Sequence, residues 1–314
     1  MWAFVLRRLA VLAFTLLVVS LLAFLLPYLS GGDPARTIMR ARVAELAVDT
    51  AEVDAIRQQL GLDRALPLQY LSWLSDAARG DLGYSFTSRQ KVGAEIGRGL
   101  LVSLTLALTA LAAALAVAIP LGTLAALRPG KIVDSIATFL TQSFVAIPEY
   151  WLAPMAILVF ALHLGWLPSA GWLGPSSVVL PALALAPRPL AYFTRVTRAA
   201  MIDVLQAPYI TAARSRGLSM RQTVLRHGLR NSSLPVLTLF ALWLAGLLGG
   251  SVVIEVIFSI PGMGRLIYQA VVNSDIPMLQ GGLVCIVAIS VIINTVVDII
   301  YGLVNPTVRV THVN

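Results

Sequence analysis

The chain has 314 residues, of which 58% are hydrophobic and 12% are charged, and its mean hydropathy is +0.84. Soluble domains usually contain about 25% charged residues, so this composition excludes a soluble globule, a disordered chain and a free DNA-binding domain. The net charge of +8 would suggest a nucleic-acid partner in a soluble protein. In so apolar a chain the placement of the basic residues matters more, because it orients membrane helices. The single cysteine, Cys285, lies in an apolar run and excludes a disulfide framework. We interpret the chain as an integral membrane protein.

The first apolar run extends from Leu9 to Leu29 and follows Arg7 and Arg8. It matches the roughly 20 residues that a helix needs to cross a bilayer, whereas the apolar core of a signal peptide has about 7–15. Residues 1–30 are therefore predicted to hold a retained transmembrane helix with its N-terminus in the cytoplasm.

Residues 31–99 form a polar stretch that is predicted to lie outside the hydrocarbon. With Ser30, this stretch contains nine basic and nine acidic residues, so it offers no strong steering field. Ala51–Leu60 and Pro67–Ala78 are predicted to be amphipathic helices.

Five further apolar runs follow, at 100–127, 134–162, 177–199, 234–256 and 280–304. The third of these contains Pro181, Pro187, Arg188 and Pro189, but proline is tolerated in membrane helices when neighbours satisfy the backbone. The sequence predicts an all-α membrane protein with six transmembrane helices. Its core is 100–305, its inside loop is 200–232, and its tail is 306–314.

The basic residues support this topology. With the N-terminus inside, the short inside segments hold twelve Arg and Lys, and the short outside connections at 163–176 and 257–279 hold only Arg265. The long segment after the first helix is exempt, because long loops cross regardless of charge. Both termini are therefore predicted to be cytoplasmic.

The sequence offers no catalytic, metal or nucleotide site. Its three histidines, at 163, 227 and 312, are far apart, and no Ser-His-Asp or Cys-His set suggests a hydrolase. A phosphate-binding loop needs Gly-Lys followed by Ser or Thr, but Lys131 after Gly130 precedes Ile132. We expect no catalytic residue, no metal and no ATP bound by that route.

Residues 199–237, which contain this inside loop, are too polar to span a membrane and too patterned for a linker. Ala212 to Leu218 is predicted to be a short helix that ends at Gly217, and Ser219 with Gln222 predicts a capping box that starts a second helix ending near Leu229. Such a helix–turn–helix suits docking into a cleft on another protein. Its arginines equally suit an anionic lipid surface, and physics alone leaves both hypotheses open.

Several motifs occur in a fixed order along nearly the whole chain. The inside loop has Thr211-Ala212-Ala213-x3-Gly217, followed by Leu234-Pro235. The others, in chain order, are Gly32-Asp33-Pro34; Leu60-Gly61-Leu62-Asp63 with Gln69-Tyr70 and Trp73; Gly80-Asp81-Leu82-Gly83-x-Ser85; Phe258-x-x-Pro261-Gly262-x-Gly264; Asp275-x-Pro277 with Gln280-Gly281; and Asp298-x-x-Tyr301-x-x-x-Asn305-Pro306-x-x-Arg309. Together they resemble the B-type permeases of bacterial ABC importers for dipeptides, oligopeptides or nickel. The loop is similar to the EAA motif of that family, with Thr211 in place of the usual Glu, as in the peptide-importing branch.

The resemblance implies a type I ABC importer permease fold with a cytoplasmic coupling helix between helices 4 and 5. It implies a complex in a bacterial inner or plasma membrane with a homologous C-type permease, two ATP-binding subunits and an extracytoplasmic substrate-binding protein. ATP and Mg would be bound by the partner ATPases, so this chain would bind no cofactor and be no enzyme. The implied substrates are di- and oligopeptides, with a nickel chelate, glutathione or another small ligand as the alternative.

The resemblance also implies two groups of site residues. The ATPase-coupling residues would be Thr211, Ala212, Ala213, Arg216, Gly217, Leu218 and Ser219. The outer gate and the binding-protein contact would involve Asp81, Phe258, Pro261, Gly262 and Asp275.

Glu149 and Arg188 are ionisable residues within the predicted third and fourth helices. Such residues usually face the bundle interior, pair or line a water-filled path. One hypothesis is that they pair in one state and line the translocation path in another. The other is that Glu149 lies near the outer interface after a break at Pro148, and that Arg188 snorkels.

Two other classes of protein were weighed against an importer. A membrane enzyme or receptor predicts clustered polar residues near one membrane face, and the sequence shows none. A channel acting alone has no need for a docking helix–turn–helix inside the cell.

Overall fold

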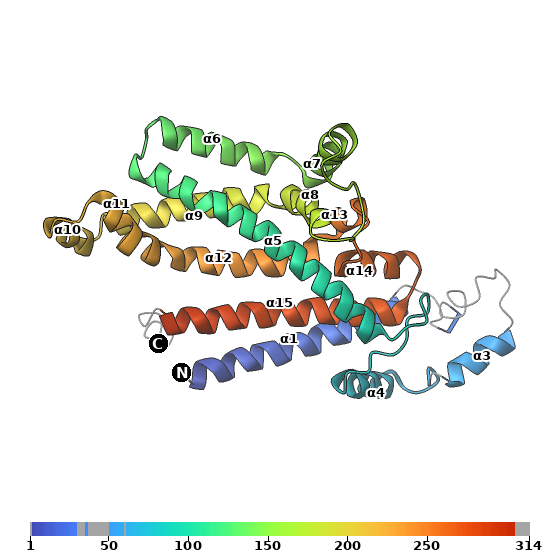
Figure 1. The fold of residues 1–314 in the computed structure, drawn as a ribbon. Coiled ribbons are helices and arrows are strands. Elements are labelled where there is room, and N and C mark those ends of the chain that lie inside the picture. Colours follow the sequence, from blue (N-terminus) through green and yellow to red (C-terminus); the bar gives the residue numbers. More distant parts are fainter. Residues whose placement is uncertain (1, 30–34, 37–49, 60, 305–314) are drawn as a thin grey trace. The chain divides into compact units, whose positions relative to one another are not determined.

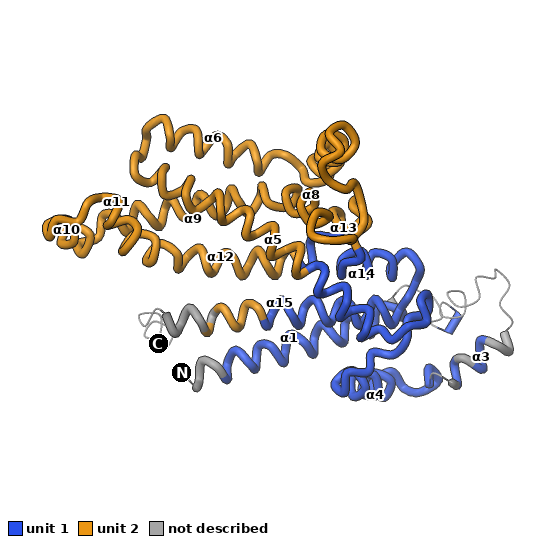
Figure 2. Tube along the Cα trace, in the orientation of Figure 1, with its two compact units in different colours: residues 1–103, 248–252, 261–292 blue, residues 104–247, 253–260, 293–314 orange. Residues whose placement is uncertain are grey.

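The computed structural model describes residues 2–29, 35–36, 50–59 and 61–304, and this part of the chain is helical apart from turns and one isolated bridge between Tyr84 and Lys91 (Figure 1). The predicted tail 306–314 lies outside the described residues. The chain divides into two compact units, coloured in Figure 2. Unit 1 comprises residues 1–103, 248–252 and 261–292, and unit 2 comprises residues 104–247, 253–260 and 293–314.

Unit 1 contains α1 (Trp2–Leu29), α3 (Thr50–Gln59), α4 (Leu66–Ala78), the start of α5 (Val92–Leu127), α14 (Met263–Val272) and most of α15 (Ile276–Val304). Its core joins α5, α14 and α15 through Val92, Ile96, Met263, Ala270 and Met278. The predicted amphipathic helices of the polar segment are present as α3 and α4.

Glycine allows α15 to approach α5 closely within unit 1. A Cβ atom on Gly281 would lie 2.9 Å from Cγ1 of Val92, which is closer than van der Waals contact permits. A glycine at this position therefore sets how near the two helices come.

Unit 2 contains the rest of α5, then α6 (Ile132–Ala146), α7 (Glu149–Ala156), the π-helix η1 (Ile157–His163), α8 (Ser176–Leu185), α9 (Pro187–Leu205), α10 (Pro208–Ser215), α11 (Met220–Thr223), the π-helix η2 (Val224–Gly228), α12 (Leu229–Gly250) and α13 (Val252–Ile257). α6 packs along α9. α5 crosses α9 at Gly122, where a Cβ atom would lie 2.7 Å from the carbonyl oxygen of Thr194.

Four helical segments are long and apolar enough to cross a membrane: Leu6–Tyr28, Val92–Leu127, Met220–Gly250 and Ile276–Val297. A fifth is obtained when the bent pair Ile132–Ala146 and Glu149–His163 is taken as one span. Among the described residues the structure thus identifies four or five spans, and the sixth stays a prediction.

The predicted span over 134–162 is divided between α6 and the pair α7 and η1. The run bends by 94° between Ala146 and Glu149. Proline has no N–H and disfavours the helical region for the residue before it, and Ile147, which precedes Pro148, is extended at φ −80° and ψ 121°.

The weak run at 177–199 is divided between α8 and α9. Ala186 at the junction keeps helical dihedrals, and the N–H groups of Ala186 and Leu190 both find carbonyl partners four residues back. The prolines here shorten the apolar helix to Ser176–Leu185, which by itself is too short to count as a span.

Two other boundaries differ from prediction. α5 begins at Val92, eight residues before the predicted start at 100, and α12 ends at Gly250 although the apolar run continues to 256. Ser251 interrupts that run, and α13 begins after it.

The Gly122 crossing gives a stability prediction. We expect Gly122→Ala to lower the thermal unfolding temperature of the purified complex, because the new methyl group meets backbone atoms of α9 and overpacking costs about 1–3 kcal/mol. Gly246→Ala is the matched control, since Gly246 is also helical and its added Cβ meets nothing within 4 Å. A G122A complex that melts with the wild type would show that α5 and α9 do not approach this closely.

Candidate functional site

The loop between α9 and α12 contains all seven predicted ATPase-coupling residues. α10 (Pro208–Ser215) ends in a Schellman motif around Gly217, whose φ is +91°. The N–H of Gly217 donates to the carbonyl of Arg214 at 2.9 Å, and the N–H of Leu218 donates to that of Ala213 at 3.4 Å. The predicted glycine-terminated helix is confirmed.

The predicted capping box at the start of α11 is also confirmed. Oγ of Ser219 accepts from the N–H of Gln222 at 3.4 Å, and Oε1 of Gln222 accepts from the N–H of Ser219 at 3.0 Å. The helix does not end near Leu229, as predicted, because η2 continues it into α12. The turn is therefore connected to α12 without an intervening loop.

One side of the turn faces solvent and the other packs on unit 2. The residues with exposed side chains or backbone are Thr211, Ala212, Arg216, Gly217 and Ser219. Leu218 is half-buried, whereas Ile210 and Ala213 are buried. The structure thus presents five of the seven predicted residues on one accessible surface.

A small apolar cluster supports this surface from beneath. Ala126 at the end of α5, Met201 in α9 and Val224 in η2 are buried together. Gly228 fits closely on this cluster, because a Cβ atom there would lie 3.0 Å from Sδ of Met201. The turn is consequently fixed to the ends of α5 and α9 as well as to α12.

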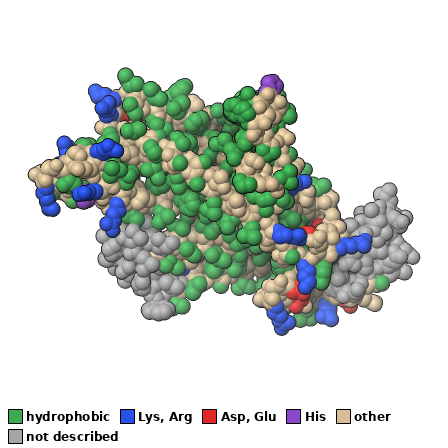
Figure 3. All heavy atoms as spheres, viewed as in Figure 1, with side chains coloured by type: hydrophobic (Ala, Val, Ile, Leu, Met, Phe, Trp, Pro, Cys, Tyr) green, Lys and Arg blue, Asp and Glu red, His purple; other side chains and the backbone are tan. Residues whose placement is uncertain are grey.

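The accessible surface is strongly basic. In Figure 3 the blue side chains of Lys and Arg gather around α10 and α11, which are labelled in Figure 1. Exposed arginines of this loop are Arg214, Arg216, Arg221, Arg226 and Arg230. Such a surface suits a partner that presents carboxylates, and it equally suits an anionic lipid surface.

Sequence reasoning missed an ion pair between α6 and α9. Nε and Nη2 of Arg198 donate to the two carboxylate oxygens of Asp134 at 2.5 and 2.7 Å, and the N–H of Gly130 donates to the same carboxylate at 2.8 Å. Asp134 is 5% exposed, so its carboxylate is largely shielded from solvent, whereas the Arg198 side chain is 33% exposed. Only a weak indication of this pair is present in the sequence. Asp134 lies in the first helical turn after Pro129-Gly130, and Arg198 is one of seven arginines between 195 and 230.

Arg198 connects this ion pair to the loop. It lies on α9, which ends at Leu205 just before α10 begins at Pro208. α9 therefore contacts the α5–α6 turn through this ion pair and leads into the loop at its C-terminal end.

Glu149 and Arg188, both in unit 2, do not form an ion pair within the described part of the chain. Glu149 is half-buried at the first position of α7, after the Pro148 break, and Arg188 is exposed near the start of α9. The break that the second hypothesis requires is present.

The five predicted outer residues are divided between the units. Asp81, Pro261, Gly262 and Asp275 belong to unit 1, and Phe258 belongs to unit 2. Asp81 and Pro261 are exposed, Gly262 precedes α14, and the buried Phe258 accepts a backbone hydrogen bond from Gly171 at 2.8 Å.

Asp275 is 2% exposed and holds an internal loop. Its carboxylate accepts hydrogen bonds from Oγ of Ser85 and from the N–H groups of Phe86 and Thr87, the last two at 3.1 Å. The carboxylate also accepts from the N–H of Met278 at 3.4 Å, and it thus attaches the 85–87 loop to the start of α15.

Comparison with known proteins identifies the family of the chain. The family model described as the inner membrane component of binding-protein-dependent transport systems matches residues 118–310, and the model of its N-terminal region matches residues 1–109. The chain is 37% identical over 306 residues to the glutathione transport system permease protein GsiC of Escherichia coli K12, covering 98% of both chains. The GsiC of Shigella flexneri serotype 5b gives the same identity and coverage.

The fold has solved counterparts as well. A chain of the inward-facing MetNI methionine ABC transporter aligns with a TM-score of 0.55 and 21% identity, covering 67% of this chain and 96% of that one. A second crystal form of MetNI gives a TM-score of 0.56. At this identity the likeness concerns the fold alone. The two family models and the relatives matched over nearly their full length are decisive: this chain belongs to the family of inner membrane components of binding-protein-dependent transport systems and is a permease subunit of an ABC importer.

Proposed function

We propose that this permease imports small peptides, and that it forms the translocation path together with a homologous permease. The observation that carries the proposal is the 37% identity, over 98% of both chains, to a permease named for glutathione, which is chemically a small peptide. The alternative is that the same architecture imports glutathione itself, a nickel chelate or another small ligand. In such systems the binding protein delivers the ligand, so the pore does not set specificity alone.

The uptake of radiolabelled ligands by cells that express the complete importer tests this proposal. We expect uptake of a di- or tripeptide, and competition between that peptide and glutathione. Uptake of a nickel chelate that no peptide inhibits would contradict the peptide assignment.

We further propose that the exposed surface of α10, Gly217 and Ser219 is the coupling surface for one partner ATPase. Support comes from the self-capped turn, the basic side chains and the continuity with α12. ATP binding would bring the two ATPases together, and the surface would move with its ATPase. The permease would then shift between inward-open and outward-open packings, driven by the difference in ATP affinity between the two states.

The proposed topology places six crossings in the membrane with both termini in the cytoplasm. The asymmetry of basic residues supports it. In this topology the α10–α11 turn lies inside and the 61–91 region lies outside.

Gly217→Val tests coupling. The added side chain meets nothing within 4 Å, so its effect comes from the backbone, where a φ of +91° costs a β-branched residue roughly 1–3 kcal/mol. We expect normal assembly, a loss of substrate-stimulated ATP hydrolysis and a matching loss of transport. Gly217→Asn is the control, because Asn tolerates left-handed dihedrals and should retain most of both activities. Unchanged stimulation in G217V would remove the turn from the coupling surface.

Single cysteines in a Cys285→Ser background test the topology. We expect Ser88→Cys to react with an impermeant thiol reagent in intact cells, since Ser88 is exposed. Ser219→Cys should react only after the membrane is opened. Labelling of S219C in intact cells would overturn the proposed orientation.

Charge reversal tests whether Glu149 and Arg188 meet during the cycle. We expect Glu149→Arg and Arg188→Glu each to reduce transport strongly, because each places two like charges near each other. The double variant should recover part of the activity. Harmless single reversals, or a double variant no better than either, would leave Arg188 as a snorkelling residue without a partner.

A further inference from the structure

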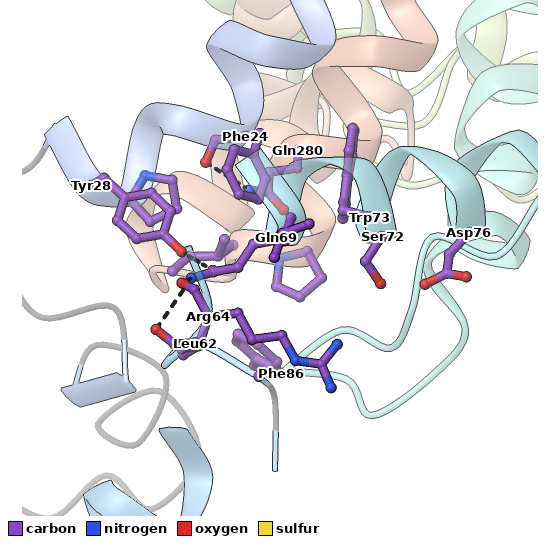
Figure 4. A pocket seen from close by; sticks show the side chains of 15 residues that line it. Phe24, Tyr28, Leu62, Arg64, Gln69, Ser72, Trp73, Asp76, Phe86 and Gln280 are labelled. Atoms are coloured by element: carbon purple, nitrogen blue, oxygen red, sulfur yellow. Dashed lines mark hydrogen bonds between the residues drawn. The ribbon is translucent and has the colours of Figure 1, made fainter. Parts of the chain in front are cut away.

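A pocket of about 280 Å³ lies within unit 1, between the C-terminal end of α1, α4 and the start of α15 (Figure 4). Its aromatic walls are Phe24, Tyr28, Trp73 and Phe86. The coupling surface and the proposed path residues belong to unit 2, so neither proposal above uses this pocket.

α4 lies against the membrane-spanning part of α1. The hydroxyl of Tyr70 is 2.8 Å from Oγ of Ser20, which is 3% exposed. Pro27 and Tyr28, the last residues of the apolar span, line the pocket, so the pocket lies at the depth of the membrane–water interface. Ser20 is eight residues before Tyr28, so its contact with Tyr70 lies about 12 Å further along the helix, inside the span.

The surface of α4 suits that position. The helix has no buried residue, and its Leu68 and Leu71 are 58% and 59% exposed. Beside it the span of α1 exposes Leu21, Leu22 and Leu26. Lipid chains would cover the exposed leucines of these two neighbouring helices and keep them from water, as they do for interfacial amphipathic helices.

Aromatic rings strengthen the same conclusion. Phe24, Tyr70 and Trp73 form a cluster with ring centroids 5.5 to 6.4 Å apart. Trp and Tyr gather at membrane interfaces, where an apolar ring and a polar edge are both satisfied. The pocket thus opens at the level of the lipid headgroups.

Hydrogen bonds fix the shape of the pocket in advance. Oε1 of Gln69 accepts from the hydroxyl of Tyr28 at 2.5 Å, and Nε2 of Gln69 donates to the carbonyl of Arg64 at 2.8 Å and to that of Leu62 at 3.2 Å. Nε2 of Gln280 donates to the carbonyl of Phe24 at 3.4 Å. The segment that carries Arg64 is therefore tied to both α1 and α4.

Two opposite charges line the pocket. Arg64 and Asp76 are both exposed, and within the described part of the chain neither side chain has an ion pair or a hydrogen bond. In Figure 4 the guanidinium of Arg64 extends away from Phe24 and Gln280. A guanidinium binds phosphate well, while a carboxylate and aromatic faces bind an ammonium group.

The size of the pocket selects among ligands. Pockets for drug-sized molecules usually measure about 300–1,000 Å³, so this one is at or below the lower limit and suits a compact polar group. A ligand that carries both a phosphate and an amine, and that lies at an interface lined with leucine, is a zwitterionic phospholipid.

We propose that this pocket binds the phosphoethanolamine headgroup of a membrane phospholipid, with its phosphate on Arg64 and its ammonium on Asp76. The acyl chains extend along the exposed leucines of α1 and α4. The bound lipid fills the junction between α1 and α4 and holds α4 at the interface. This assignment does not depend on which leaflet the C-terminal end of α1 faces.

Native mass spectrometry of the delipidated, fully assembled importer tests the proposal, with dioleoylphosphatidylethanolamine added back in steps. We expect one lipid to bind more tightly than the rest, and Arg64→Gln and Asp76→Asn each to weaken that binding about tenfold. Arg79→Gln and Asp63→Asn are matched controls, because both residues are exposed, lie in the same region and do not line the pocket. Ser72→Phe, which fills the pocket from α4, should abolish the tight binding without touching either charge.

Four other ligands distinguish a membrane phospholipid from soluble molecules with the same charged groups. Dioleoylphosphatidylglycerol, which lacks the amine, should bind more weakly to the wild type and gain relative to phosphatidylethanolamine in D76N. Inorganic phosphate and water-soluble glycerophosphoethanolamine should not displace the lipid at millimolar concentration. Displacement by either, displacement by a dipeptide, or equal occupancy in S72F and the wild type would overturn the proposal.

Discussion

Hydrocarbon provides no hydrogen-bond partner for a backbone N–H or C=O, and the architecture of this protein follows from that constraint. A chain with this composition folds as helices, and each departure from the helix must satisfy its own polar groups. Outside the hydrocarbon, the solvent-exposed turn at Gly217 also pairs backbone groups locally, with a Schellman motif before it and a capping box after it. These local hydrogen bonds define the shape of the proposed coupling surface.

One ion pair and one close helix crossing attach α9, the helix before the loop, to its neighbours in unit 2. The bidentate contact between Asp134 and Arg198 joins the start of α6 to α9, and Gly122 lets α5 approach the same helix. Since α9 is followed closely by α10, the loop is attached to a helix that itself contacts α5 and α6. The Arg198 side chain is 33% exposed, so solvent screens the pair, and removing one member would cost less than it does in a fully buried pair.

The polar segment after α1 has two structural roles in unit 1. Asp275 secures residues 85–87 to the start of α15, and the contact between Tyr70 and Ser20 secures α4 to α1. The segment is thus attached to membrane helices at two places. In the proposed phospholipid site it also becomes a part of the protein that contacts lipid.

The sequence by itself determined the class of protein, most of its spans, the amphipathic helices α3 and α4, and both caps of the α10–α11 turn. These depend on local patterns: apolar run length, a glycine that takes a positive φ and a serine three residues before a glutamine. Only the tertiary structure decided the 94° bend at Pro148, the continuation of α11 into α12, the Asp134–Arg198 pair and the pocket beside α4. Their residues are distant in sequence or depend on how neighbouring helices satisfy a broken backbone. Two charges 64 residues apart show no pattern until packing brings them together.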